Sequence, residues 1–313
     1  MNFKNDKTRS FTETILITTL MTLYVLLGIY FIPVITILYP IPFIILGIRH
    51  GIKYNLTAIV VSSILISILI EPFTGLFVFV AFAPLSIFLA YMIKEKKNSY
   101  EIFGFSALIT IVSFLATIFL IGKISGVDFI ASIDQSLSEV LKAQINMLKD
   151  KGLSEYELYN FKDILKNAYN YFSLVIPSTL IIFSGFTAYI NYLLSVTILR
   201  NLGYGKIDVP KLSYFRLPSN IILGTIVIFL AVFLMKVFKV LYYDAIFVNV
   251  TVLVSFVFFL QGFTVILFYI NKLVQNKFLR VLLVIFTLPL GMIISFVGFL
   301  DVIFDFRKIK REI

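Results

Sequence analysis

Long apolar runs recur along almost the whole chain, with only short polar or basic segments between them. A helix needs about 20 apolar residues to cross the roughly 30 Å hydrocarbon core of a bilayer, and most of these runs are long enough. The composition agrees, since 60% of the residues are hydrophobic and only 14% are charged, whereas soluble domains have about 25% charged residues. The sequence therefore predicts an integral membrane protein.

The predicted fold is all-α, a polytopic transmembrane helical bundle with about 8–9 membrane segments. The sequence lacks the short segments of alternating hydrophobicity that are typical of a transmembrane β-barrel. The expected membrane segments are residues 12–31, 33–49, 54–70, 73–93, 101–122, 171–199, 217–237, 245–270 and 278–304. We expect the second segment to be a broken helix, because Pro40 and Pro42 both lack a backbone N–H donor.

Basic residues predict the side of the membrane on which each loop lies. Lysine and arginine gather before the first segment and after segments two, four, six and eight, and the positive-inside rule assigns these positions to the cytoplasm. We therefore expect a cytoplasmic N-terminus. Nine full crossings would place the basic residues of 307–311 outside. Either the last segment is a re-entrant hairpin that turns at residues 289–291, or an upstream segment is miscounted, or the rule fails here; a cytoplasmic C-terminus is favoured.

One long hydrophilic region interrupts the apolar runs, at residues 123–170. Its apolar residues recur at helical spacing, which predicts an amphipathic helical hairpin outside the cytoplasm. The hairpin is either a spacer on the lipid headgroups or a lid over a pocket. The expected organisation is a six-span core over residues 1–200 that includes this hairpin, a basic linker at 201–216, and C-terminal membrane segments with a basic tail at 217–313.

Several classes of function lack support in the sequence. Cysteine is absent and His50 is the single histidine, so no thiolate site or histidine cluster can form. There is no glycine-rich phosphate loop and no nucleophile with an obvious base. We therefore expect no enzymatic activity, no cofactor and no metal. The net charge of +10 lies mostly in loops and tails, where anionic lipid accounts for it, so the lipid bilayer rather than nucleic acid is the expected partner.

Three short motifs resemble those of a known family. The first is Ile32-Pro33 followed by Tyr39-Pro40-Ile41-Pro42 and then Gly47-Ile48-Arg49-His50-Gly51, the second is Leu260-Gln261-Gly262, and the third is Gly298-Phe299-Leu300-Asp301 with Asp305-Phe306-Arg307. Together they resemble the YybS-like family of bacterial multi-pass membrane proteins, a domain of unknown function. The resemblance covers nearly the whole chain and implies a location in the bacterial cytoplasmic membrane.

The N-terminal half of that family is similar to the S components of energy-coupling factor transporters. This similarity implies that a small molecule binds near the outer face, and that a transmembrane coupling subunit with ATPases supplies the energy. In S components, alanines on the first helix contact the coupling subunit. The corresponding stripe here is Thr14, Thr18 and Thr22, which still allows another helix to approach closely.

Broken backbone and one acidic turn supply the first candidate ligand contacts. Pro40 and Pro42 free backbone groups that either coordinate a ligand, as in transporters with discontinuous helices, or are satisfied by neighbouring helices. Glu71 lies at the expected outer turn between the third and fourth segments. It either binds a cationic group of a substrate or is a solvated turn residue.

Three amides lie within the apolar runs: Asn191, Asn249 and Gln261. Amides in hydrocarbon commonly hold helices together, at about 0.6–2 kcal/mol each, so a structural role is the default and ligand contact is the alternative. Gln261 is the strongest candidate of the three for a ligand contact, because Gly262 beside it lets another backbone come close.

Charged residues close the last apolar run. A bare Asp301 or Asp305 at the bilayer centre would cost about 2.5–3.5 kcal/mol, so each must lie at an interface or pair with a base. Nearby Arg307 and Lys308 favour an interfacial charge cluster on an emerging helix. A proton-coupling carboxylate pair is the alternative.

These observations favour one function and leave a second open. The first is a small-molecule binding and uptake component of S-component type that needs a separate energising partner. The alternative is a non-transporting membrane scaffold or regulator that acts through helix–helix contacts.

Overall fold

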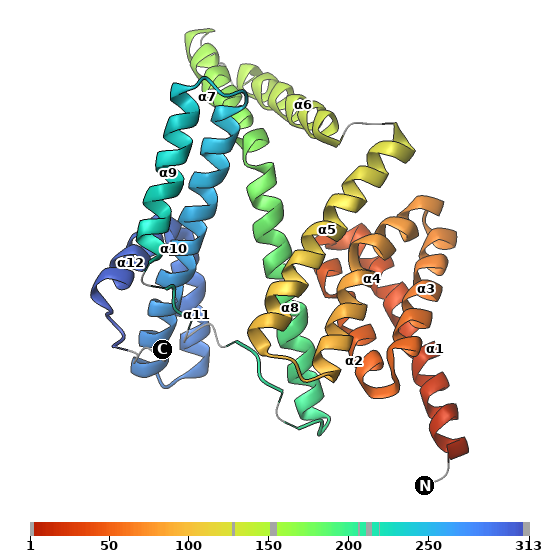
Figure 1. The fold of residues 1–313 in the computed structure, drawn as a ribbon. Coiled ribbons are helices and arrows are strands. Elements are labelled where there is room, and N and C mark those ends of the chain that lie inside the picture. Colours follow the sequence, from red (N-terminus) through yellow and green to blue (C-terminus); the bar gives the residue numbers. More distant parts are fainter. Residues whose placement is uncertain are drawn as a thin grey trace. The chain divides into compact units, whose positions relative to one another are not determined.

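The computed structural model describes residues 3–126, 129–150, 155–205, 207–210, 215–218 and 220–308, and every regular element within these ranges is a helix. Figure 1 shows their course. The elements are α1 (Phe3–Phe31), η1 (Pro33–Leu38), α2 (Pro40–His50), α3 (Ile52–Leu69), α4 (Pro72–Lys94), α5 (Ser99–Ser125), α6 (Phe129–Asp150), α7 (Glu155–Leu174), α8 (Ile176–Asn201), α9 (Ile221–Val237), α10 (Tyr243–Leu273), α11 (Lys277–Thr287), η3 (Leu288–Leu290) and α12 (Gly291–Phe304).

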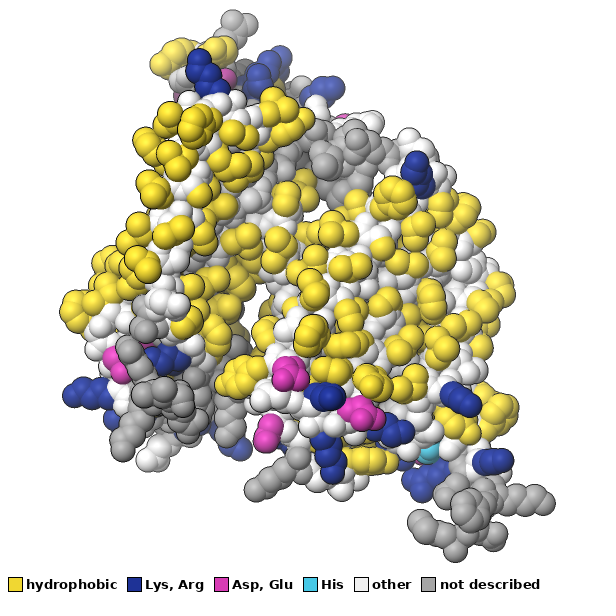
Figure 2. Space-filling model, in the orientation of Figure 1, with side chains coloured by type: hydrophobic (Ala, Val, Ile, Leu, Met, Phe, Trp, Pro, Cys, Tyr) yellow, Lys and Arg dark blue, Asp and Glu magenta, His cyan; other side chains and the backbone are white. Residues whose placement is uncertain are grey.

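Seven segments among the described residues are long and apolar enough to cross a membrane. They are Lys7–Phe31, Pro33–His50, Ile52–Leu69, Pro72–Lys94, Ser99–Ile124, Ile176–Asn201 and Tyr243–Leu273. Apolar side chains cover the outer surfaces of the long helices on the face shown in Figure 2, as expected for helices that contact lipid. The predicted all-α polytopic bundle is confirmed.

The chain forms two compact units, and the first comprises Met1–Val140 and Phe183–Val209. In it α3 packs against α1, α2 and α4, and α4 also packs against α2 and α5. Fully buried apolar side chains of α2, α3 and α4, such as Phe43, Ile59 and Leu85, form its centre.

The prolines of the second segment start a helix and do not interrupt one. The short helix η1 ends at Leu38, and α2 begins with Pro40 at its first position. Proline is well tolerated there, because the first N–H groups of a helix have no partner within the helix. The predicted break is therefore a change from a 3-10 helix to an α-helix at Tyr39, inside one apolar segment that runs from Pro33 to His50.

The second unit comprises Leu141–Ile182 and Pro210–Ile313. Here α10 packs most extensively on α12, and it also contacts α7, α9 and α11. This division differs from the expected boundaries, because residues 141–182, which contain most of the predicted hairpin, group with the C-terminal segments. The physical reason is the contact of α7 with α10, which is described below.

The last apolar stretch is not one straight crossing. Helices α11 and α12 are bent by 100° relative to each other across the short helix η3. The bend lies where residues 289–291 were expected to turn the chain, and its angle fits both a broken span and a re-entrant loop.

Candidate functional site

Two glycines in the second unit bring α10 and α12 into backbone contact. A Cβ added to Gly262 would lie 1.9 Å from the carbonyl oxygen of Ile294, and one added to Gly298 would lie 1.9 Å from that of Phe258. Only glycine fits at both positions, as at other close crossings of membrane helices. The crossing brings Gln261, next to Gly262, close to Asp301, one turn after Gly298.

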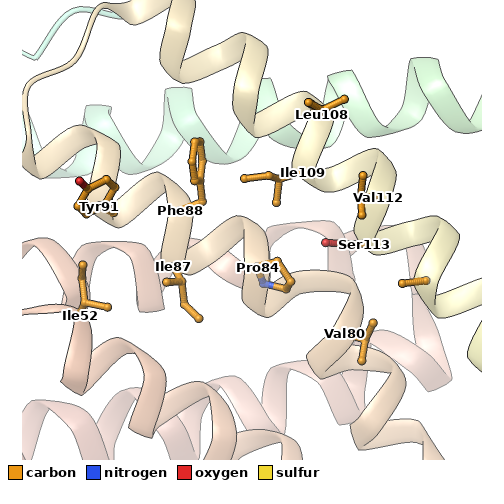
Figure 3. Close-up of a pocket in the computed structure, with 11 residues that line it drawn as sticks. Ile52, Val80, Pro84, Ile87, Phe88, Tyr91, Leu108, Ile109, Val112 and Ser113 are labelled. Carbon is orange, nitrogen blue, oxygen red and sulfur yellow. The ribbon is translucent and has the colours of Figure 1, made fainter.

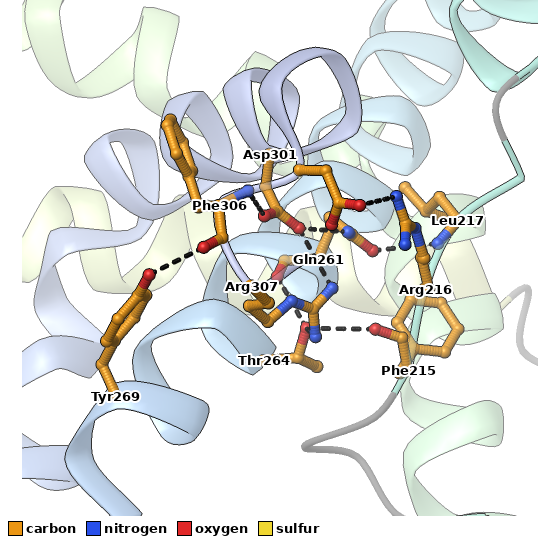
Figure 4. A network of polar contacts seen from close by, with 10 residues as sticks. Phe215, Arg216, Leu217, Gln261, Thr264, Tyr269, Asp301, Phe306 and Arg307 are labelled. Atoms are coloured by element: carbon orange, nitrogen blue, oxygen red, sulfur yellow. Dashed lines mark hydrogen bonds and ion pairs between the residues drawn. The ribbon is translucent and has the colours of Figure 1, made fainter. Parts of the chain in front are cut away.

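Asp301 is the centre of the polar network that this crossing creates (Figure 4). Its Oδ2 accepts hydrogen bonds from Gln261 Nε2 at 2.6 Å and from Arg307 Nη2 at 3.0 Å. Its Oδ1 accepts the backbone N–H of Phe306 at 2.9 Å. The side chains of Asp301 and Arg307 are each only 1% exposed. A buried ion pair of this kind needs such additional hydrogen bonds to offset its desolvation.

The same network fixes the segment that leads into α9. The backbone N–H of Leu217 donates to Gln261 Oε1 at 2.9 Å, and Arg216 Nη2 lies 2.8 Å from Asp305 Oδ2. Arg307 Nη1 donates to Thr264 Oγ1 at 3.0 Å. We refer to Arg216, Gln261, Thr264, Asp301, Asp305 and Arg307 as the clasp. Its bonds link α10, α12 and residues 215–217, which indicates a structural role.

The clasp differs from the interfacial charge cluster that the sequence suggested. Asp301 and Arg307 are buried inside the unit, whereas Lys308 is exposed. Helix α12 ends at Phe304, and Asp305 has a left-handed backbone with a φ of 49°. Helical spacing therefore stops at Asp305, and this turn directs Arg307 back toward Asp301.

Asn191 hydrogen-bonds to a backbone carbonyl in η1, next to the prolines of the second segment. Its Nδ2 donates to the carbonyl oxygen of Ile37 at 2.8 Å. Tyr24 donates in the same way to Ile35, at 2.6 Å. Neighbouring helices thus satisfy the carbonyls freed before Pro40, which favours the structural alternative over ligand coordination there.

Asn249 has the same role at the break between α7 and α8. Its Nδ2 donates to the carbonyl of Leu174 at 2.7 Å, and its Oδ1 accepts the N–H of Ser178 at 2.8 Å. These two backbone groups flank Pro177, which has no N–H of its own. The amide therefore ties the end of α7 and the start of α8 to α10.

The threonine stripe of α1 faces the interior of its own unit. Thr14, Thr18 and Thr22 are 8%, 5% and 3% exposed. Thr18 Oγ1 lies 3.4 Å from the carbonyl oxygen of Ala58, and Thr22 Oγ1 lies 3.0 Å from Ser62 Oγ. The small residues allow close approach as expected, and the helix that approaches is α3 of the same chain.

An apolar recess of the first unit lies away from these candidate residues. It is a groove of about 640 Å³ along α4 and α5 (Figure 3). Its lining residues include Pro84, Phe88, Ile109, Val112 and Ala116. Glu71 does not line it; this residue is exposed at the turn before α4, and its side chain makes no capping hydrogen bond.

Two of the three motifs that resemble a known family supply residues of the clasp. The profile of the family described as "Predicted membrane protein (DUF2232)" matches residues 15–303. The chain belongs to this family. It is also 27% identical to the uncharacterized protein YybS of Bacillus subtilis (strain 168), over 97% of this chain and 99% of that protein. No solved structure matches it.

In this DUF2232 protein the remaining motif, which contains Arg49 and His50, belongs to a group of contacts with Glu13 that the sequence analysis did not predict. Arg49 Nη1 and His50 Nε2 each lie 2.8 Å from Glu13 Oε2, and Ser10 Oγ lies 2.8 Å from His50 Nδ1. These contacts join the start of α1 to the end of α2, so Arg49 and His50 hold helices together. The sequence did carry a sign of this contact, because Glu13 is the first carboxylate within an apolar run and follows Arg9 by four residues.

Proposed function

We propose that this membrane protein is the small-molecule binding component of a bacterial uptake system, comparable in role to the S components of energy-coupling factor transporters. The observation that carries the proposal is the groove of about 640 Å³ along α4 and α5. Ligand pockets commonly have volumes of about 300–1,000 Å³ and mainly apolar walls. The groove therefore suits a molecule with an apolar body.

A separate subunit supplies the energy in this proposal, because the sequence has no nucleotide-binding motif. That subunit does not contact the threonine stripe, which α3 already covers. It contacts the opposite face of α1, where Leu16, Leu20 and Leu27 are more than half exposed. The N-terminus lies in the cytoplasm, and the protein itself has no catalytic role.

The test is mass spectrometry of the small molecules that the detergent-purified protein retains. Ala116→Phe fills part of the groove. Leu115→Phe is the matched control, because Leu115 lies next to Ala116 but is 51% exposed and does not line the groove. A non-lipid molecule retained by the wild type and by Leu115→Phe but lost from Ala116→Phe would support the proposal.

A different result would favour a scaffold or regulator that acts through helix–helix contacts. The observation in favour of that function is that Asn191, Asn249 and Gln261, which were candidate ligand contacts, all bond within the chain. A wild-type protein that carries lipid alone, with the same lipid in both variants, would contradict the uptake proposal.

A further inference from the structure

A second cavity of the first unit has a different chemical character. Its volume is also about 640 Å³, and it lies where α4 ends, α5 begins and the residues after α8 return. Lys94, Lys96 and Lys97 line it. We refer to this cavity as the lysine pocket. It does not share a lining residue with the apolar groove.

A tight turn brings the three lysines together. Helix α4 ends at Lys94, and the backbone N–H of Lys97 donates to the carbonyl of Met92 at 3.3 Å. Lys96 has a φ of 51°, a left-handed conformation that a lysine seldom adopts. Asn98 Oδ1 then accepts the N–H of Tyr100 and caps α5. The turn thus brings three lysines to the pocket between two capped helix ends, whereas Glu95 within the same turn does not line it.

The opposite wall is fastened by hydrogen bonds to the backbone of residues 207 and 208. The Tyr192 hydroxyl, on fully buried Tyr192, donates to the carbonyl of Asp208 at 2.6 Å. Arg200 donates to the carbonyl of Ile207. Ile48, Ile93 and Ile102 supply apolar lining. The pocket therefore has a fixed polar wall, an apolar portion and a cationic side.

The charge of the pocket is not balanced by the residues that line it. Among the described residues that line it, Asp208 is the one acidic residue, against three lysines. Within the described part of the chain, none of these lysines forms an ion pair. Lysine binds phosphate as a point charge. A phosphodiester carries one negative charge and a phosphate monoester about 1.5–2, so either would offset at least half of the excess of two that remains after Asp208.

We propose that the lysine pocket binds a phosphate group, carried either by an anionic lipid headgroup or by a soluble phosphate ester. The two sources have the same chemistry at the lysines. They differ in whether acyl chains accompany the phosphate. This site is independent of the uptake function proposed above.

The test is native mass spectrometry of the full-length protein in neutral detergent, titrated separately with phosphatidylglycerol, phosphatidylcholine and glycerol 3-phosphate. The variant Lys94→Gln/Lys96→Asn/Lys97→Gln removes the charges, and asparagine tolerates the left-handed backbone at position 96. Lys123→Gln/Lys142→Gln/Lys149→Gln is the control, because it changes the net charge equally at exposed positions outside the pocket.

We expect the pocket variant to bind the phosphate probe at least about tenfold more weakly, and the control to stay within about twofold of the wild type. Asp208→Asn removes a repelling carboxylate but keeps the backbone carbonyl that Tyr192 bonds, so we expect it to bind several-fold more tightly. This gain does not depend on whether the triple variant folds. Binding should also weaken as salt is raised.

The three probes distinguish the sources. Binding of phosphatidylglycerol alone identifies a lipid headgroup, whereas binding of glycerol 3-phosphate identifies a soluble ester. Equal binding of phosphatidylcholine and phosphatidylglycerol with no binding of glycerol 3-phosphate, equal losses in the two triple variants, or no effect of Asp208→Asn would overturn the proposal.

Discussion

Replacing Arg307 with methionine should destabilise the protein strongly, because it leaves a buried carboxylate without its counter-charge. Asp301 Oδ2 lies 3.0 Å from Arg307 Nη2, and both side chains are 1% exposed. Breaking a buried ion pair by removing one partner costs about 3–5 kcal/mol. The remaining donors to Asp301, from Gln261 and Phe306, are neutral and offset only part of that cost.

Removing both charges should cost less than removing one. In Asp301→Asn/Arg307→Met no unpaired charge remains, and replacing a whole buried pair by neutral groups is often close to neutral. We expect the double variant to lie within about 2 kcal/mol of the wild type. Arg216→Met is the matched control, because the side chains of Arg216 and Asp305 are 18% and 35% exposed and a pair that keeps contact with solvent contributes less than a fully buried one.

The assay is reversible unfolding in mixed micelles by titration with sodium dodecyl sulfate, applied to the wild type, the two single variants at 301 and 307, the double variant and the control. The double-mutant cycle isolates the coupling free energy between the two side chains. The reasoning fails if Arg307→Met costs no more than Arg216→Met, or if the double variant costs at least the sum of its two single variants.

Three further substitutions test the packing, and the same unfolding titration measures each. Gly298→Val should cost more than about 3 kcal/mol, because its Cβ would lie 1.9 Å from the Phe258 carbonyl. Gly104→Ala is the control and should be neutral or stabilising, because nothing lies within 4 Å of the added Cβ. Similar losses of stability in both variants would contradict the close crossing. Asn191→Leu should cost about 1–3 kcal/mol by leaving the Ile37 carbonyl unsatisfied, and an unchanged stability would show that the amide is dispensable. Thr18→Leu should cost about 1–3 kcal/mol by overpacking α1 against α3; a normal stability would indicate that the stripe is open to a partner.

Hydropathy predicted seven of the nine expected membrane segments, because the length needed to cross hydrocarbon is a local property of the sequence. The expected segment 217–237 is the shorter helix α9, and 278–304 is the bent pair α11 and α12. The break at Pro40 was also predictable from local chemistry, since proline has no N–H. Its partner was not, because Asn191 is 154 residues away in sequence from Ile37, whose carbonyl it bonds. Sequence alone identified the intramembrane amides as polar groups that need partners, but it did not identify the partners.

The clasp shows where spacing along one helix misled the prediction. Asp301, Asp305, Arg307 and Lys308 were expected to form an interfacial cluster on one emerging helix, but α12 ends at Phe304 and the left-handed backbone of Asp305 turns the chain back. Arg307 therefore meets Asp301 inside the unit. Gly262 pointed to the close approach of another backbone, yet the sequence did not identify Gly298 of α12 as the partner, because which two helices meet depends on tertiary packing.

The measurement that tests the proposed binding function most directly is photo-crosslinking from within the groove. A photoreactive side chain placed at Ile109, which lines the groove, is compared with one at Phe105, which is on the same helix about one turn away, is 54% exposed and does not line it. Cells are irradiated, and the adducts are identified by mass spectrometry. We predict a discrete non-lipid adduct at position 109 that is absent at position 105. Phospholipid adducts alone, in equal amounts at both positions, would contradict a small-molecule binding function for the groove.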